Sequence, residues 1–194
     1  MVRLAAALAV IVLILSTTSA SAATATVTMS NYAFTAKALT VRLGNSVNWR
    51  NNSTKTHTAT PSVNWSWSGV SVAKGTTSSD VAPTQAGTFP YFCSIHPTLM
   101  KGKIKVPINV SPPNGSVATT FTFTVGTVTA PGVLVHDTYI RRNGGPWQLR
   151  VSSAGATVSF FFTQTGTWDV RTRLRYQLGG ATSGWSPITT VVVS

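Results

Sequence analysis

The sequence predicts an all-β protein built from two β-sandwiches. Val, Thr, Ser and Gly dominate the 194 residues, whereas Glu is absent and Leu and Lys are sparse. β-Branched residues favour strands, and the missing residue types are strong helix formers. Short alternating segments separated by Gly, Asn, Pro and Ser clusters recur along the chain, as in sandwich domains. No segment shows a convincing helical period.

Residues 1–22 have the pattern of an export signal. Arg3 supplies a positive start, residues 4–15 form a near-continuous apolar run, and Ala20-Ser21-Ala22 offers small residues for cleavage. A run of twelve residues is too short to cross a hydrocarbon core, which needs roughly 20. We therefore expect an exported protein, at the cell surface, in the periplasm or outside the cell, without a transmembrane segment in its mature chain.

Residues 23–110 are expected to form the first sandwich and residues 117–194 the second. Between them, residues 111–116 contain consecutive prolines followed by Asn-Gly, which no central strand tolerates. We expect a short linker there that keeps the domains close without fixing their angle. The strand-like segments are residues 25–29, 39–43, 46–49, 87–93 and 103–110 in the first domain and 119–125, 133–141, 156–162, 168–176 and 188–193 in the second.

Positive charge is spread over both predicted domains. Fifteen Lys and Arg against three Asp give a net charge of +12, which favours acidic partners such as an acidic protein or an anionic cell-surface polymer. Simple solubility is the alternative explanation. Nucleic acid is not expected as a partner, because an exported chain with no binding motif is a poor candidate.

The chemistry is concentrated in residues 93–100, between two strand-like segments. Cys93, the only cysteine, has no internal disulfide partner, which leaves an inert thiol, an intermolecular bridge or a metal ligand. His96 and Met100 follow it closely. A thiolate and imidazoles suit copper in both oxidation states, and a thioether is a soft, weak donor. A second histidine is needed, and His57, in a polar turn after the strand ending at Trp49, is the candidate.

Residues 24–110 resemble the plastocyanin and amicyanin family of cupredoxins. The matching features are residues 27–34, 44–49, 51–52 before His57, 67–69, and 86–91 leading into Cys93-x-x-His96. The resemblance implies a Greek-key sandwich holding one blue (type 1) copper ion through His57, Cys93 and His96, with Met100 as a weak axial ligand. A purely packing role for Met100 is the alternative.

Two features depart from the family pattern. Met100 is the fourth residue after His96, whereas amicyanin-like loops place methionine third and plastocyanin-like loops fifth. Thr58 follows His57 where many relatives have Asn, which ties the two ligand loops together by hydrogen bonds. We expect the hydroxyl of Thr58 to form part of these hydrogen bonds.

The implied function is outer-sphere electron transfer between redox partners, not catalysis. One cysteine and three histidines leave no ligands for a second, catalytic copper, and no paired carboxylates or nucleophile–base pair is evident. The resemblance makes His96 the electron port, flanked by Pro97 and Leu99. Lys101, Lys103 and Lys105 follow closely, and they either steer an acidic partner or form one solvated strand face. The alternatives are a copper storage or delivery protein and an adhesive surface protein.

The second domain resembles a fibronectin type III or immunoglobulin-like sandwich through residues 139–142, 168–176 and 184–187. In residues 168–176 one face is apolar, and the other carries Arg171, Arg173 and Arg175. We expect Trp185 to stack between these guanidinium groups. His136 is expected to be a hydrogen-bonded strand residue.

Overall fold

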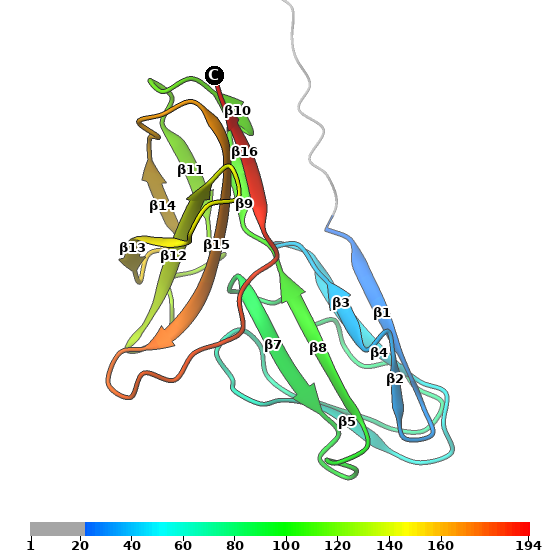
Figure 1. The fold of residues 1–194 in the computed structure, drawn as a ribbon. Helices are drawn as coiled ribbons and strands as arrows, with labels where there is room; N and C mark the ends of the chain where they lie inside the picture. The colour runs from blue at the N-terminus through cyan, green and yellow to red at the C-terminus, as the bar shows by residue number, and fades with distance from the viewer. Residues whose placement is uncertain (1–21) are drawn as a thin grey trace, which may run out of the picture.

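The computed structural model describes residues 22–194, which form strands and contain no helix. The all-β prediction is confirmed, and no helix in this part of the chain is long and apolar enough to cross a membrane. The predicted export signal, apart from Ala22, lies outside the described residues. Two strand-rich bodies lie side by side, with the copper-motif loop of residues 93–100 at the far end of the first body (Figure 1).

The first sandwich consists of a three-stranded and a five-stranded sheet. The smaller sheet has the order β2-β1-β4 and the larger one the order β3-β8-β7-β5-β6. Aromatic side chains fill the space between them: Trp49 stacks on Trp67 at 5.2 Å and meets Tyr91 edge-on. The strands are β1 (Thr24–Ser30), β2 (Ala33–Thr35), β3 (Ala38–Thr40), β4 (Ser46–Asn51), β5 (His57–Pro61), β6 (Val70–Val72), β7 (Gly87–Phe92) and β8 (Lys101–Val106).

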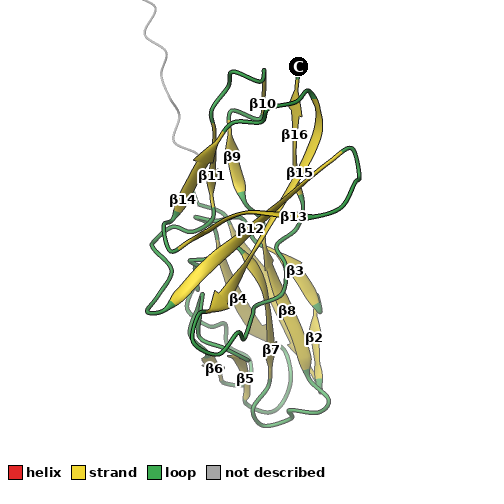
Figure 2. Cartoon of the chain, turned by 60° about the vertical axis from the view of Figure 1, so that its left-hand side comes forward, coloured by secondary structure: helices red, strands yellow, loops and turns green. Residues whose placement is uncertain are grey.

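The second sandwich pairs the sheet β14-β11-β9 with the sheet β10-β16-β15-β12-β13. Figure 2 shows β12, β13 and β15 of the larger sheet in front. Four phenylalanines, Phe121, Phe123, Phe160 and Phe162, are buried between the sheets. The strands are β9 (Asn109–Ser111), β10 (Asn114–Gly115), β11 (Phe121–Thr124), β12 (Leu134–Arg142), β13 (Gln148–Ser153), β14 (Thr157–Phe160), β15 (Gly166–Tyr176) and β16 (Thr189–Val193).

The predicted alternation in β15 is present: Val170, Thr172 and Leu174 are buried, and the arginines lie on the outer face. Trp185 stacks against two of the three expected arginines, Arg171 and Arg173. Arg175 does not join this stack, because Asp137 on the neighbouring strand holds it in an ion pair at 2.7 Å.

The segment expected to be a free linker takes part in the second sandwich. β9 pairs with β11, and β10 pairs with β16. Both are edge strands, and Pro112 and Pro113 lie between them, where no ladder hydrogen bond is required of their nitrogens. The expectation of an unfixed angle between the domains is wrong, because hydrogen bonds join the two sandwiches directly.

Gln85 and His136 form the buried centre of this junction. The amide nitrogen of Gln85 donates to the carbonyls of Val128 and Thr129 across the junction, and His136 Nε2 donates to Gln85 Oε1 at 2.8 Å. Thr172 Oγ1 lies 3.4 Å from the other ring nitrogen of His136, so the expectation of a hydrogen-bonded strand histidine is confirmed. Burial lowers the pKa of His136 to about 4.

Candidate metal centre

Two strands and one loop bring the predicted ligands together at one end of the first sandwich. β5 begins at His57, β7 ends immediately before Cys93, and the loop from Cys93 to Met100 leads into β8. The register of β5 and β7 pairs Thr60 with Phe92. If this register is continued beyond β7, the residue after His57 lies beside the residue after Cys93.

His57, Cys93 and His96 form a compact donor cluster. Cys93 Sγ lies 3.6 Å from His57 Nδ1 and 3.8 Å from His96 Nδ1, and all three donor atoms are within 4.8 Å of one another. Metal–sulfur and metal–nitrogen bonds of about 2.3 and about 2.0 Å in a trigonal plane separate sulfur and nitrogen by about 3.7 Å. The residues present therefore fit a single metal ion of copper's ligand preferences.

Three of the four candidate ligands are buried, and the fourth reaches the surface. Cys93, His57 and Met100 are buried, whereas His96 is partly exposed. Burial, and then the nearby positive charges of His96 and Lys55, lower the pKa of His57. The imidazole of His57 is therefore neutral at neutral pH, which is the form that binds a metal.

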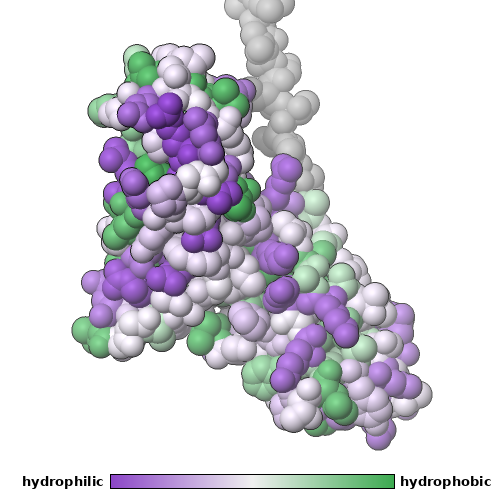
Figure 3. Space-filling model, in the orientation of Figure 1, coloured by the Kyte–Doolittle hydropathy of each residue, from purple (hydrophilic) through white to green (hydrophobic). Residues whose placement is uncertain are grey.

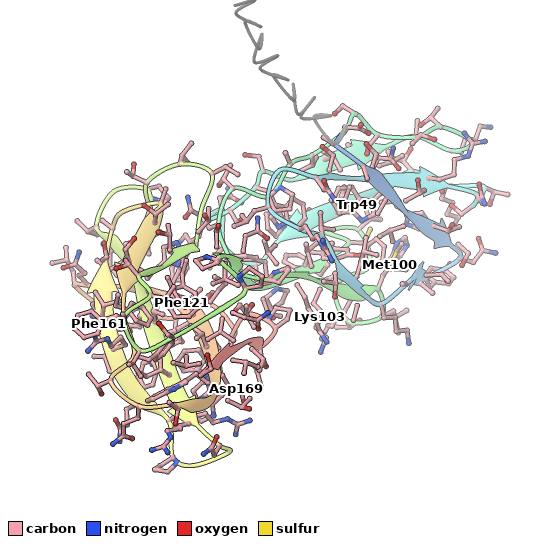
Figure 4. All side chains as sticks on the ribbon, turned by 90° about the horizontal axis from the view of Figure 1, so that it is seen from above. Trp49, Met100, Lys103, Phe121, Phe161 and Asp169 are labelled. Atoms are coloured by element: carbon pink, nitrogen blue, oxygen red, sulfur yellow. The ribbon has the colours of Figure 1, made fainter. Side chains whose placement is uncertain are left out.

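Backbone hydrogen bonds close the ligand loop on itself. His96 N donates to Cys93 O, Met100 N donates to His96 O, and Cys93 N donates to Met100 O, each at 3.0 Å. This pattern brings Met100 back beside Cys93. Its side chain is fully buried inside the first sandwich, as is that of Trp49 (Figure 4). The four residues His57, Cys93, His96 and Met100 are positioned for one copper ion.

Thr58 ties the two ligand loops together. Its hydroxyl accepts a hydrogen bond from Ser94 N at 2.8 Å, which confirms the expected replacement for the asparagine of many relatives. Its own backbone N–H donates to Cys93 Sγ at 3.4 Å. A donor aimed at sulfur stabilises the thiolate, so this residue supports the ligand both sterically and electrostatically.

Asn51 shapes the turn that presents His57. Its buried amide nitrogen donates to Lys55 O and Val72 O, both at 2.8 Å, and its oxygen accepts from the backbone and hydroxyl of Ser53. All hydrogen-bonding positions of this side chain are in use. The sequence indicated Asn51 only as part of a family motif. The structure shows that its side chain holds the turn before His57 in place.

Exposed apolar side chains accompany His96 in the ligand loop. Leu99 and Ile95 are 68% and 52% exposed, and the adjacent Pro97 is exposed as well. Tyr32, which the sequence did not single out as a site residue, lies against His96 with its ring edge-on. The only sequence signal for it was its place in the opening family motif, residues 27–34.

The family model for a cupredoxin-like domain matches residues 4–106, more than half of the chain. Among solved structures, an oxidised mutant of amicyanin is 25% identical, with 42% of this chain and 79% of that chain covered and a TM-score of 0.38. A reduced Cu(I) mutant of amicyanin at pH 4 is 24% identical, with 47% and 87% covered and a TM-score of 0.39. No curated protein matches the sequence. With its family model and its three converging copper-type ligands, the chain belongs to the cupredoxin-like family.

Proposed function

We propose that the protein carries single electrons between redox partners, with one copper ion held by His57, Cys93 and His96 and weakly by Met100. The observation that carries this proposal is the position of Cys93 Sγ between two histidine Nδ1 atoms, at distances suited to one shared metal ion. Copper bound there would supply a one-electron couple at potentials set by the protein.

The chain's own residues favour electron transfer over substrate chemistry. The closed backbone loop and Asn51 hold the ligands in fixed positions, so little rearrangement accompanies a change in charge. Cys93 and Met100 are sealed from solvent, which excludes water and small substrates from that side. Among the described residues, His136 is committed to the junction and supplies no second metal site. These features favour a carrier over an enzyme.

His96 is the proposed electron port. The exposed Ile95, Pro97 and Leu99 of the same loop offer a small apolar contact for a partner, and weak electron-transfer encounters bury small interfaces. Lys101 and Lys103 are exposed nearby and attract an acidic redox protein over long range.

The remaining parts of the proposal concern location and the second domain. The apolar N-terminal run supports export through a cleaved signal. We propose that residues 117–194 form a fibronectin type III-like module, supported by the Trp185 stack and the outer arginine row, and that this module contacts an anionic cell-surface polymer.

Addition of Cu(II) to the purified chain tests the central claim. We expect an intense blue thiolate-to-copper band that disappears on reduction and returns on oxidation with the copper retained. Cys93→Ser should abolish the band, and His136→Gln, which leaves the cluster intact, should keep it. A colourless product, or loss of copper on reduction, would instead indicate storage or delivery and would refute electron carriage.

A further inference from the structure

A segment of the second sandwich completes a sheet of the first. β5 pairs with β7 only near Phe92, at the end of β7. At the start of β7, Thr88 instead exchanges backbone hydrogen bonds of 2.9 and 3.0 Å with Gly184. The hydroxyl of Thr88 also donates to Trp185 O at 2.6 Å. A Cβ at Gly184 would come within 2.9 Å of the Thr88 side chain, so only glycine permits this approach. The position of Trp185 relative to β7 is therefore fixed.

A row of lysines approaches this junction from the copper loop. Lys101, Lys103 and Lys105 alternate along β8 with inward-facing residues such as Ile104, which places the lysines on the outer face about 6.8 Å apart. Figure 4 shows Lys103 on the surface of the first sandwich, and Figure 3 shows hydrophilic residues along this strand. Lys105 lies directly opposite Thr88 in the register of β7 and β8. The row thus ends at the junction.

A ladder of stacked arginines begins on the other side of the junction. Arg171 lies between the rings of Trp147 and Trp185, at 4.0 and 4.1 Å from their centroids. Arg173 lies over the other side of Trp185 at 4.5 Å, and Arg141 lies over Trp147 at 4.6 Å. Stacking fixes the planes of the guanidinium groups, which reduces the entropy lost when their N–H edges bind an anion.

The positive charges of the ladder are crowded and only partly compensated. Burial, and then the charges of Arg141 and Arg173, lower the pKa of Arg171. Within the described residues, Asp169 pairs with Arg141 and Asp137 with Arg175, while the lysine row, Arg171 and Arg173 form no ion pair. An anion placed along this surface would relieve the repulsion.

We propose that the β8 lysine row and the arginine–tryptophan ladder form one cationic surface, continuous across the junction, that binds a flexible linear polyanion. The inference rests on the partner part of the proposed function and deepens it. A polymer fits better than a folded acidic protein because the surface spans two sandwiches whose strands run at an angle to one another (Figure 1). A flexible chain follows such a bend, whereas one rigid protein face covers about 800 Å² of nearly flat surface.

Binding of long-chain inorganic polyphosphate to the metal-free full chain tests the proposal, with tryptophan fluorescence as the readout. We expect Lys103→Gln and Arg173→Gln each to weaken binding and to lower the slope of log affinity against log salt by about one charge. In the double variant the two losses should multiply. Arg50→Gln, an exposed arginine on β4 outside this surface, is the control of equal charge. Arg173→Lys separates loss of charge from loss of stacking.

Three results would overturn the inference. In the first, only one of the two variants Lys103→Gln and Arg173→Gln weakens the binding of long polyphosphate. In the second, Arg50→Gln weakens binding as much as Lys103→Gln, which indicates that net charge alone drives binding. In the third, long polyphosphate binds no more tightly than tripolyphosphate, which indicates recognition of isolated anionic groups such as those on a folded partner. Copper is absent from these measurements, and Lys103→Gln should leave the copper spectrum unchanged, so the test is independent of electron carriage.

Discussion

The ring of Tyr32 meets the ring of His96 edge-on, with centroids 4.8 Å apart and planes at 87°. Tyr32 occupies the turn between β1 and β2 with a φ of 63°, a left-handed conformation that costs an ordinary residue roughly 1–2 kcal/mol. Glycine would fit this turn without strain. The tyrosine ring, although 45% exposed, is the contact that restrains the exposed ligand on that side.

Tyr32→Gly should therefore separate stability from ligand order. We expect a free energy of unfolding that is unchanged or raised by about 1 kcal/mol, together with a more mobile His96 imidazole in the metal-free protein and a shifted reduction potential in the copper form. NMR line widths of the imidazole and voltammetry measure these effects. Tyr32→Phe keeps the ring and should match the wild type; equal behaviour of both variants would remove the positioning role.

Met100→Leu distinguishes an axial ligand from a packing residue. The buried side chain changes little in volume, so the loss of stability should stay below about 1.5 kcal/mol. Loss of the axial donor leaves three ligands, a number that Cu(I) accepts more readily than Cu(II), so the reduction potential should rise while the blue band persists. Voltammetry of the two proteins provides the comparison. An identical potential would show that Met100 only fills space.

Thr58→Val removes the hydroxyl that accepts from Ser94 N but keeps the backbone donor to Cys93 Sγ. We expect a loss of about 1–2 kcal/mol in urea unfolding, because a loop N–H is left unpaired, and a broader blue band as the ligand loops move apart. Thr58→Ser retains the hydroxyl and serves as the control. The tie is refuted if the serine and valine variants are equally destabilised.

The junction should weaken in mild acid. The pKa of His136, about 4 in the folded chain, lies below its ordinary value of 6.5, so the unfolded state takes up the proton first. The contribution of neutral His136 to the free energy of unfolding is fully present above about pH 6.5. It is lost as the pH approaches 4, by about 3 kcal/mol at most. Urea unfolding across this range should show a shallower decline for His136→Gln. Parallel pH profiles for the two proteins would contradict the assignment.

Trp185→Ala should destabilise the chain by about 2–4 kcal/mol, because it removes the centre of the stack between Arg171 and Arg173. Trp185→Phe keeps an aromatic face and should lose less. Since Thr88 bonds to this segment, both sandwiches should unfold together in each variant, as monitored by circular dichroism and by the blue band. An unchanged midpoint for Trp185→Ala would show that the stack contributes nothing to stability.

The copper cluster could be predicted because its signals are local. Cys93, His96 and Met100 share one loop, and His57 follows a recognisable strand and turn. The outer arginine row was likewise visible as a period of two along one strand. One segment carries the whole arginine pattern, whereas the copper pattern needs two segments, the loop of residues 93–100 and the turn that leads to His57.

The junction could not be predicted, because its partners are far apart in the chain. Nothing near Gln85 indicates that its amide will meet the Val128 and Thr129 carbonyls, and nothing near Thr88 indicates Gly184. Pro112 and Pro113 correctly excluded a central strand at this point. They did not reveal that the residues on either side of them form edge strands of the second sandwich. Tyr32 was missed for a related reason: its role depends on a contact with a loop more than sixty residues away.

The Thr88–Gly184 bridge also has a consequence for the order in which the protein is made. When the first sandwich leaves the ribosome, the start of β7 lacks its partner and the Gln85 amide lacks its acceptors, since both arrive only with residues 126–136 and 184. Closing so long a loop is slow. The nascent first sandwich thus remains open along one sheet edge until residue 184 has been synthesised.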